Sequence, residues 1–584
     1  MKRDLQGMAG RTHDLAVVGG GIYGACVARE AARRGLTVGL LEGRDFGHAT
    51  SANSLRVVHG GLRYLQHGDL RRMRDSIRER RTLLDLAPHL VAPLPFAIPV
   101  YGHGPRGKAA HAAALAIADL VGLGLNGSDD PGRRIPRGRV VSRAELLRLA
   151  PGLPAVGVTG GALWHDAQVR SSERLLIAFL ESACRAGARL ANHAEVVGYL
   201  REGRRVSGVV ARDQLTGDEV EIPARIVVNA AGPWADAALR PLADLAAEPR
   251  FLTSKGFNLL TRQILPDREL GIPGPARFRD RDAWVHKGRR LFFIVPWRGY
   301  SLLGTRHLPY DGSPEGFRIT RGDVRLFLDE VAEAYPPATL DERDVLAVYG
   351  GLLPRSPGSP PDGEVELLKR SRVIDHGRED GVPGLISLVG TKWTTARAVA
   401  ERAVRLAAER LGRPAGSHAP GPPLPGGDVS PFGEWLASKR ASRPAAAPED
   451  ALVHLLANHG SGYAEVLRLA AEDPSLAEPL REGSPVIGAE VVHAVRMEAA
   501  MRLDDVVSRR TELALGGAPG DRALESCAAL MARELNWDAA RTGRELEHAR
   551  DALRRRLPWG DESPPGNRRR EGSPAPGQHM AQAM

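Results

Sequence analysis

Residues 14–24 read Asp-Leu-Ala-Val-Val-Gly-Gly-Gly-Ile-Tyr-Gly, and residues 36–42 read Leu-Thr-Val-Gly-Leu-Leu-Glu. The first stretch predicts an apolar strand that enters a glycine-rich turn, and the turn opens a helix over about 25–34. The second stretch predicts another strand, which ends in the acid Glu42. This order of strand, turn, helix, strand and acid is typical of the βαβ unit that binds the pyrophosphate of a dinucleotide.

Each residue type in this unit has a physical role. Gly19 permits the tight turn, Gly21 lets the backbone approach the pyrophosphate, and Gly24 lets the helix pack closely on the sheet. The helix N-terminus offers free N–H groups and a partial positive charge to the phosphates. Glu42 is placed to accept hydrogen bonds from ribose hydroxyl groups, which disfavours NADP. A glycine-rich turn alone also arises for structural reasons, and the motif leaves NAD and FAD both open.

The composition is ordinary for a soluble globular protein. At 584 residues the chain exceeds one typical core, so two or three domains are expected. The net charge of +10 comes mostly from arginines spread along the chain, and it does not indicate a nucleic-acid partner. The densest basic runs, residues 554–556 and 568–570, favour a solvated tail over attraction to anionic lipid.

The cysteines and the apolar runs bear on location. Cys26, Cys184 and Cys527 form no paired motif, so neither a disulfide framework nor a metal site is expected, and a reducing cytoplasm is the natural compartment. No secretory signal precedes residue 14, and no stretch reaches about 18 uninterrupted apolar residues. The nearest stretch, residues 109–125, predicts either a buried helix or a helix docked at a membrane interface. Peripheral contact with the inner face of the plasma membrane therefore stays open.

Two later segments also run from an apolar strand into glycine. Residues 226–232 end in Ala231 and Gly232, and residues 385–389 enter Gly390-Thr391-Lys392-Trp393-Thr394-Thr395 before a long helix. In flavoproteins with two dinucleotide-type folds the chain leaves the nucleotide domain, builds a substrate domain and returns through such strands. A helix N-terminus at Thr395 would stabilise negative charge on a reduced flavin. Three such strands favour FAD over NAD, and we assign these residues to the cofactor site: Ala231, Gly232, Gly390, Thr391 and Thr395.

Residues 51–64 read Ser-Ala-Asn-Ser-Leu-Arg-Val-Val-His-Gly-Gly-Leu-Arg-Tyr. Such a glycine-rich turn can pass close to a flavin ring, because glycine has no side chain. We assign four of its residues to the cofactor: Ser51, Ser54, Gly60 and Gly61. Arg63 is able to hold a phosphate or carboxylate through two parallel hydrogen bonds. The plainer interpretations are a surface cation for Arg63 and a turn histidine for His59.

The sequence predicts an α/β fold. It comprises a doubly wound FAD domain of the two-dinucleotide-binding type, an inserted β-rich substrate domain and a C-terminal helical domain. The expected boundaries are a disordered leader (1–13), the FAD-binding oxidoreductase domain (14–415, with the substrate part mainly in 70–165 and 240–350), a linker (416–429), the helical domain (430–558) and a disordered tail (559–584). Within the helical domain the pattern predicts helices at 448–458, 464–472, 489–507, 518–534 and 538–554.

These motifs together resemble one family, the FAD-dependent glycerol-3-phosphate dehydrogenases. The matching stretches are residues 19–24 with Glu42, His-Gly-Gly-Leu-Arg-Tyr (59–64), Leu-Ala-Pro-His-Leu-Val (86–91), Val-Asn-Ala-Ala-Gly-Pro-Trp (228–234), Phe-Ile-Val-Pro-Trp (293–297) with Gly304-Thr305, Lys392 with Thr394-Thr395, Asp-Val-Val-Ser-Arg-Arg-Thr (505–511) and Leu-Asn-Trp-Asp (535–538). The similarity covers nearly all of residues 14–556.

The resemblance implies a reaction and site roles. It implies FAD-dependent oxidation of sn-glycerol 3-phosphate to dihydroxyacetone phosphate, with electrons passed to a membrane quinone, or to oxygen in oxidase members. Arg63 and Tyr64 would contact the substrate. Removal of the C2 hydroxyl proton needs a base, and Lys392 or His59 could serve. Thr394 is assigned to the substrate as well. A homodimer stays open.

The chain departs from the family pattern at the expected substrate site. The family typically has Gly-x-Arg-Pro, whose arginine binds the substrate phosphate, but Leu353 stands at that place. The family often has Lys-Gly-Ser-His, and this chain has Asn258 in place of the histidine. Loss of a buried arginine–phosphate contact costs about 2–5 kcal/mol. Arg355 or Arg306 could compensate from a shifted position, and Arg355 is our substrate-site candidate.

Three hypotheses remain. The first is the glycerol-3-phosphate dehydrogenase reaction with a quinone acceptor. The second is a sister flavoenzyme that oxidises another small alcohol or amine. The third is a flavin-binding partner protein without turnover. A nicotinamide dehydrogenase is a poorer fourth, because the Ala231-Gly232 segment and the Lys392 loop have no evident role in it.

Overall fold

Eight strands form the first sheet, and its order explains why the glycine-rich segments meet. The computed structural model describes residues 1–104, 107–242, 245, 250–265, 267–273, 291–356, 365–414, 419–444, 448–557 and 559. The main strand order is β16-β17-β10-β1-β2-β7, with β8 and β9 joined to β10. The strands are β1 (His13–Val18), β2 (Val38–Leu41), β7 (Arg189–Ala191), β8 (Ala194–Glu202), β9 (Arg205–Asp213), β10 (Glu219–Asn229), β16 (Arg372–Asp375) and β17 (Leu385–Val389).

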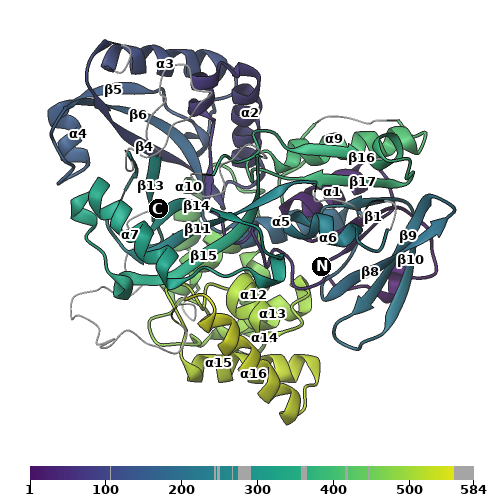
Figure 1. The fold of residues 1–584 in the computed structure, drawn as a ribbon. Helices are drawn as coiled ribbons and strands as arrows, with labels where there is room; N and C mark the ends of the chain where they lie inside the picture. Colours follow the sequence, from purple (N-terminus) through teal and green to yellow (C-terminus); the bar gives the residue numbers. More distant parts are fainter. Residues whose placement is uncertain are drawn as a thin grey trace.

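The centre of this sheet is parallel and covered on both faces. All six residues of β1 are buried, as expected for a parallel strand between two layers. Three helices share one core on one face: α1 (Ile22–Arg33), α5 (Ser172–Arg185) and α9 (Ala396–Arg410). The β8–β9 hairpin and α6 (Ala235–Leu239) pack on the other face. Figure 1 shows this α/β body beside a second, β-rich part.

The second sheet has nine strands and lies beside the first. Its main order is β15-β11-β14-β13-β12-β4-β6-β3, and β5 pairs with β6. The strands are β3 (Val57–Val58), β4 (Val91–Tyr101), β5 (Arg139–Ser142), β6 (Val158–Val169), β11 (Leu252–Arg262), β12 (Glu269–Pro273), β13 (Leu291–Trp297), β14 (Tyr300–Tyr310) and β15 (Val345–Arg355). The helices of this part are α2 (Leu70–Leu86), α3 (Lys108–Val121), α4 (Arg143–Leu149) and α7 (Arg321–Ala334), and α8 (His376–Glu379) follows β16.

The two faces of the second sheet have different neighbours. Phe257 and Phe292 pack against Phe327 of α7, with ring centroids 5.7 and 5.1 Å apart, and so mark the outer face. The opposite face carries Leu94, Phe96, Val295 and other side chains that pack against the loop at Leu55. This inner face is therefore the one that meets residues 51–64.

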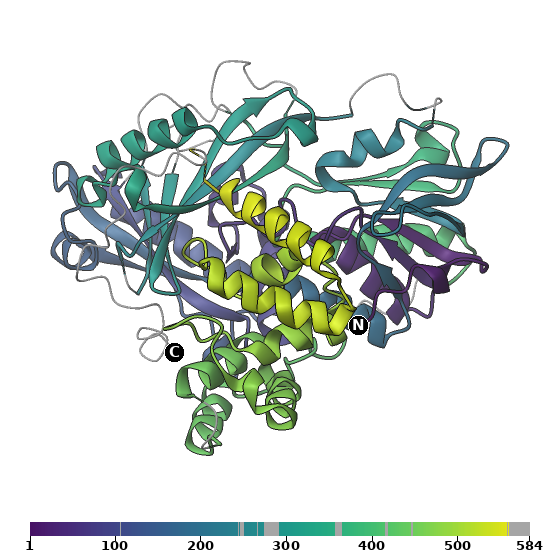
Figure 2. The same ribbon diagram turned by 90° about the horizontal axis from the view of Figure 1, so that it is seen from below.

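The C-terminal part is helical. Its helices are α10 (Phe432–Ala441), α11 (Glu449–His459), α12 (Tyr463–Glu472), α13 (Gly488–Glu498), α14 (Leu503–Asp505), α15 (Asp521–Leu535) and α16 (Ala539–Arg554). Figure 2 shows α15 and α16 lying across the boundary between the two sheet-based parts. The sequence predicted one helix over 489–507, but Ala499 adopts φ +55 and ends α13, and a π-helix follows at Val506–Arg510.

The prediction of a disordered leader at residues 1–13 is wrong. Leu5 and Met8 are 2% and 0% exposed and belong to the core between the first sheet and the β8–β9 hairpin. Arg3 donates to the carbonyl oxygen of Asn192 at 2.9 Å. These apolar and polar contacts together anchor the segment. Trp559, which we placed in a disordered tail, is buried in the core under α7.

The remaining tail, residues 560–584, and residues 415–418 of the predicted linker lie outside the described residues. The described part of that linker packs on the first domain, because Arg29 donates to the carbonyl oxygens of Pro420 and Pro422 at 3.0 and 3.2 Å. The domain boundaries stay a prediction. Among the described residues, no helix is both long and apolar enough to cross a membrane.

Candidate active site

The glycine-rich turn joins β1 to α1 at the carboxyl edge of the first sheet. Gly19 has φ +105, and a Cβ atom there would lie 2.6 Å from the carbonyl oxygen of Ala230. A Cβ atom at Gly24 would overlap the carbonyl oxygen of Gly19. At the start of α1, the backbone N–H of Ile22 donates to Ser51 Oγ at 3.0 Å. The glycines keep side chains out of this helix N-terminus, a cradle that fits a pyrophosphate.

Glu42 lies beside the turn, at the end of β2. Its carboxylate accepts hydrogen bonds from the backbone N–H groups of Gly20 (2.7 Å) and Arg44 (2.9 Å). These two bonds fix the carboxylate, and each oxygen keeps a further lone pair. The arrangement suits the role predicted for Glu42, in which it accepts from ribose hydroxyl groups.

The strands that carry the three glycine-rich segments are neighbours. β1 pairs with β10 so that Val18 lies opposite Asn229, and β10 pairs with β17 so that Asn229 lies opposite Ser387. Gly19, Ala231 and Gly390 therefore lie at the same edge of one sheet. The prediction that these three strands return to one sheet is confirmed.

Lys392 and Tyr64 meet at this edge, although 328 residues separate them. Lys392 Nζ donates to the Tyr64 hydroxyl and lies 4.1 Å from the centroid of its ring. The Arg72 guanidinium lies 4.2 Å from the same centroid. The Tyr23 hydroxyl accepts from the backbone N–H of Lys392 at 3.2 Å and donates to its carbonyl oxygen at 2.8 Å. Lys392 is thus fixed at its backbone and at its amine.

The charges of this cluster set the protonation of its members. Burial and the nearby Arg72 and Arg63 cations lower the pKa of Lys392 to about 6. Burial and Lys392 lower the pKa of His59 to about 3. Near pH 7 the Lys392 amine is therefore neutral and able to accept a proton. The His59 imidazole is also neutral but is a much weaker base.

Asp166 of β6 holds the glycine turn that precedes Tyr64. Its Oδ1 accepts from the backbone N–H of Gly60 at 2.5 Å and from Arg80, which lies 86 residues away in the chain. Its Oδ2 accepts from Trp164 Nε1 at 3.1 Å. The arginine neutralises the buried carboxylate, and together they position the loop that carries Arg63 and Tyr64.

The candidate substitutes for the missing phosphate-binding arginine do not both face this site. Arg306 forms an ion pair with Glu330 of α7 at 3.1 Å, on the outer face of the second sheet, so it cannot compensate for Leu353. Arg355 lies two residues beyond Leu353 in β15, so the two side chains are on the same face of the sheet. Arg355 forms an ion pair with Asp311 at 2.7 Å. Thr394 is 3% exposed and lies two residues beyond Lys392.

Four residues at the site were not singled out from the sequence: Tyr23, Arg72, Arg80 and Asp166. Tyr23 is part of the glycine-rich motif itself, which was the available signal. The other three contact the site across more distant segments. Arg72 and Arg80 belong to the same basic helix as several solvent-exposed arginines. Residue type alone therefore did not distinguish the site arginines from the surface arginines.

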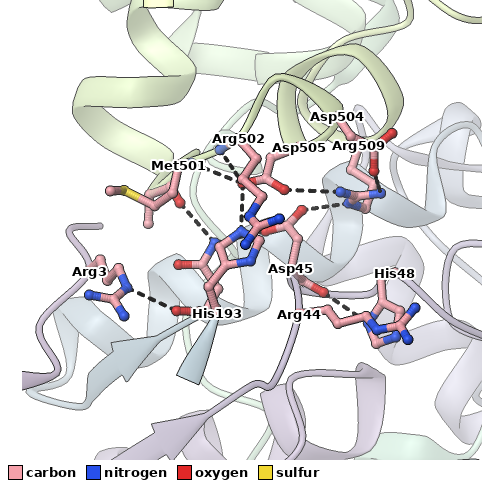
Figure 3. Close-up of polar contacts among 12 residues, drawn as sticks. Arg3, Arg44, Asp45, His48, His193, Met501, Arg502, Asp504, Asp505 and Arg509 are labelled. Carbon is pink, nitrogen blue, oxygen red and sulfur yellow. Dashed lines mark hydrogen bonds and ion pairs between the residues drawn. The ribbon is translucent and has the colours of Figure 1, made fainter. Parts of the chain in front are cut away.

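A second polar cluster joins the C-terminal domain to the loop that follows β2 (Figure 3). Asp45 accepts from Arg509 at 2.5 Å and from Arg510 at 2.7 and 2.8 Å. His193 Nε2 lies 2.9 Å from Asp505 Oδ2. Burial alone would raise the pKa of Asp45, but the Arg510 and Arg509 cations hold it well below its ordinary range. The cluster therefore attaches the C-terminal domain to the loop at Asp45, three residues beyond Glu42 of the dinucleotide cradle.

Two groups of buried side chains have a spacing that a metal ion could use. Among the described residues these are Asp45 with His193 and Asp505, and His459 with His493 and Glu498. In both groups arginines already bind the carboxylates, as when Arg174 donates to Glu498 at 2.7 Å. We assign no metal to either group.

Comparisons with known proteins identify the family of the chain. Residues 14–406 match the model of a family described as FAD dependent oxidoreductase, and residues 420–542 match the C-terminal domain of alpha-glycerophosphate oxidase. The glycerol-3-phosphate dehydrogenase of Synechocystis sp. is 33% identical over 524 residues, which cover 88% of this chain and 91% of that protein. A probable mitochondrial glycerol-3-phosphate dehydrogenase of Dictyostelium discoideum is 32% identical over 93% of this chain and 84% of its own length.

A solved structure has the same fold. The glycerol-3-phosphate dehydrogenase from Bacillus halodurans, solved with FAD, superposes with a TM-score of 0.74 at 23% identity, covering 95% of this chain and 97% of that one. The fold, the cradle and the sequence similarity over most of the chain lead to one assignment. The chain belongs to the FAD-dependent glycerol-3-phosphate dehydrogenase family, and its cofactor is FAD.

Proposed function

We propose that this protein oxidises sn-glycerol 3-phosphate to dihydroxyacetone phosphate and passes the electrons to a membrane quinone. Relatives of this name cover most of the chain, and the site supports the same reaction. Oxidation of the C2 carbinol removes one hydride and one proton. The bound flavin supplies the hydride acceptor. The proton requires a base from the protein.

Lys392 is that base. Its lowered pKa at a fixed position in the site is the single observation that carries the proposal. Its amine has a pKa of about 6, because of burial and the neighbouring arginines, and it is therefore neutral at pH 7. Its hydrogen bond to Tyr64 and the contacts of Tyr23 with its backbone hold it in place. His59, with a pKa of about 3, is the weaker candidate for this role.

Arg63 and Arg72 provide the positive charge that a phosphate needs. Both are close enough to Lys392 to lower its pKa. A phosphate dianion near these two guanidinium groups would replace their mutual repulsion with attraction. We therefore place the phosphate of the substrate between Arg63 and Arg72 and its C2 hydroxyl at Lys392.

Anaerobic mixing with glycerol 3-phosphate tests this function. The purified holoenzyme should lose its visible flavin absorption at millimolar substrate, and an artificial electron acceptor should restore it. Glycerol, which lacks the phosphate, is the matched control and should reduce the flavin much more slowly. A flavin that stays oxidised with every small alcohol would support a non-catalytic role.

A different small alcohol or amine is the second candidate substrate. The observation that favours it is the inner face of the second sheet, where Leu353 and Asn258 stand at family positions for arginine and histidine. The Asn258 amide donates to the carbonyl oxygen of Asn53 at 3.2 Å and accepts from Thr305 at 2.8 Å, so it already has partners. Faster flavin reduction by an unphosphorylated alcohol or amine than by glycerol 3-phosphate would establish this alternative.

We further propose that α3 docks on the inner face of the plasma membrane. Ile117 and Leu120 of α3 are 44% and 68% exposed, and Leu123, just beyond the end of the helix, is 69% exposed, an unusual concentration of apolar surface. Exposed arginines of the adjacent α2, among them Arg71 and Arg74, would attract anionic lipid. Residues of α3 pack near Tyr64, so a membrane at this face would bring the quinone close to the site.

A further inference from the structure

Glu269, the first residue of β12, has a buried carboxyl group that is not fully hydrogen-bonded among the described residues. Its side chain is 1% exposed, and its Oε2 has no hydrogen-bond partner among the described residues. Burial and the nearby Asp166 carboxylate raise the pKa of Glu269 well above its ordinary value, which favours the protonated form of its carboxyl group. A buried polar group without a partner is costly to a protein and requires an explanation.

The strand register places Glu269 on the inner face of the second sheet. Glu269 lies beside Phe96 of β4, which pairs with Trp164 of β6. Asp166 is two residues from Trp164 and therefore shares this face. The next residue along β12, Leu270, packs in the opposite core with Phe327 of α7. The Glu269 carboxyl group thus points away from α7.

This inner face is the side of the sheet that meets the active-site loop. Asp166 accepts from the backbone N–H of Gly60, four residues before Tyr64. Asn258 lies on the same face and donates to Asn53 of the same loop. Glu269 therefore interacts electrostatically with Asp166, the residue that holds the turn at Gly60 beside the Lys392 site.

The site has two ends that differ in charge. Arg63 and Arg72 are the cations of the first end. The second end holds the Asp166–Arg80 ion pair and the Glu269 carboxyl group. A phosphate dianion is attracted to the cations of the first end, whereas a hydroxyl group can both donate to and accept from a carboxyl group at the second end. A protonated acid in an apolar site is an established way to bind an oxygen atom.

We propose that the Glu269 carboxyl group binds the terminal hydroxyl group of the substrate, at the end opposite the phosphate, and selects polyol phosphates over their deoxy analogues. This inference takes the proposed function as its premise. Glu269 determines specificity, while the base remains Lys392. Phe96 and Trp164, whose rings lie 5.2 Å apart, form the apolar wall beside it.

The test compares two substrates with three proteins. Glycerol 3-phosphate and 2-hydroxypropyl phosphate differ only in the terminal hydroxyl group, and the proteins are the wild type, Glu269→Gln and Glu269→Leu. The wild type should prefer glycerol 3-phosphate by about 100-fold in kcat/KM, because an unmatched buried polar group is costly. Glu269→Leu should reduce this preference to about threefold, chiefly through a higher KM for glycerol 3-phosphate. Glu269→Gln should retain most of it.

The stability of the variants separates recognition from a structural role. Leucine removes an unsatisfied buried group from an apolar site, so Glu269→Leu should keep its FAD and melt no lower than the wild type. A lower melting temperature with equal losses on both substrates would overturn the inference, as would an unchanged preference in Glu269→Leu. A wild type that binds FAD but does not oxidise glycerol 3-phosphate would overturn the proposed function itself.

Discussion

Replacement of Lys392 by alanine tests the assignment of the base. An ordinary lysine with a pKa near 10.4 would be neutral in about one molecule in a thousand at pH 7.5. With a pKa of about 6, nearly every Lys392 is neutral at that pH. The site thus raises the fraction of usable base about 1,000-fold, which lies within the ~10²–10⁴-fold that a general base contributes. We expect Lys392→Ala to lower the rate of flavin reduction about 1,000-fold.

The assay is anaerobic stopped-flow reduction of the bound flavin by glycerol 3-phosphate, measured across pH. In the wild type the rate should rise tenfold per pH unit below about 6 and level off above it, because the protonated amine cannot act as a base. In Lys392→Ala this pH dependence should disappear, and a small primary amine added to the buffer should restore part of the rate. Lys439→Ala, in the C-terminal domain, is the matched control. Turnover within threefold of the wild type, or an unchanged pH profile, would refute the assignment.

Three further predictions concern phosphate binding, domain docking and membrane contact. Leu353→Arg should lower the KM for glycerol 3-phosphate about tenfold by adding a phosphate partner, and an unaltered KM would mean that the phosphate lies elsewhere. Asp45→Asn should cost about 3–5 kcal/mol in thermal unfolding, because it leaves the buried Arg510 without its carboxylate and removes one of the carboxylates that pair with Arg509, whereas the half-exposed control Asp75→Asn should cost under about 1 kcal/mol. The pKa of Asp45 is depressed in the folded state, so this stabilisation is present above about pH 4 and is lost on acidification; equal melting curves at pH 7 would contradict it. Leu120→Asp should abolish sedimentation with anionic vesicles, whereas Val156→Asp, also at an exposed apolar residue, should not, and equal binding by both would exclude α3.

The parts of the fold that depend on local pattern were predictable. The βαβ unit at residues 14–42 combines a mainly apolar strand with glycines whose positions allow few alternatives, and the structure contains it as β1, α1 and β2. The hairpin between β9 and β10 followed from the Thr216-Gly217-Asp218 turn between two alternating strands. Pro93, Pro95 and Pro99 lie within β4, although proline is usually excluded from the interior of a sheet. The three prolines are separated by even numbers of residues, so the N–H groups that they lack would all lie on one side of that strand.

The rest of the site depends on contacts between distant segments, which one sequence does not encode locally. Arg306 follows a family motif and was a reasonable candidate for phosphate binding, but the strand register turns it towards α7. Asp166 controls the turn at Gly60 from 106 residues away. The acid Glu269 stands in an ordinary apolar strand, and only the sheet register shows which face it occupies.

The central claim is that this chain holds FAD where Lys392 can deprotonate glycerol 3-phosphate. The most direct measurement is the absorption spectrum of the purified holoenzyme during anaerobic titration with that substrate. The account predicts a yellow protein whose flavin bands bleach to completion at about one substrate per flavin or in modest excess. A protein that purifies without flavin and takes up none, or one whose bound flavin stays oxidised at millimolar glycerol 3-phosphate, would contradict it.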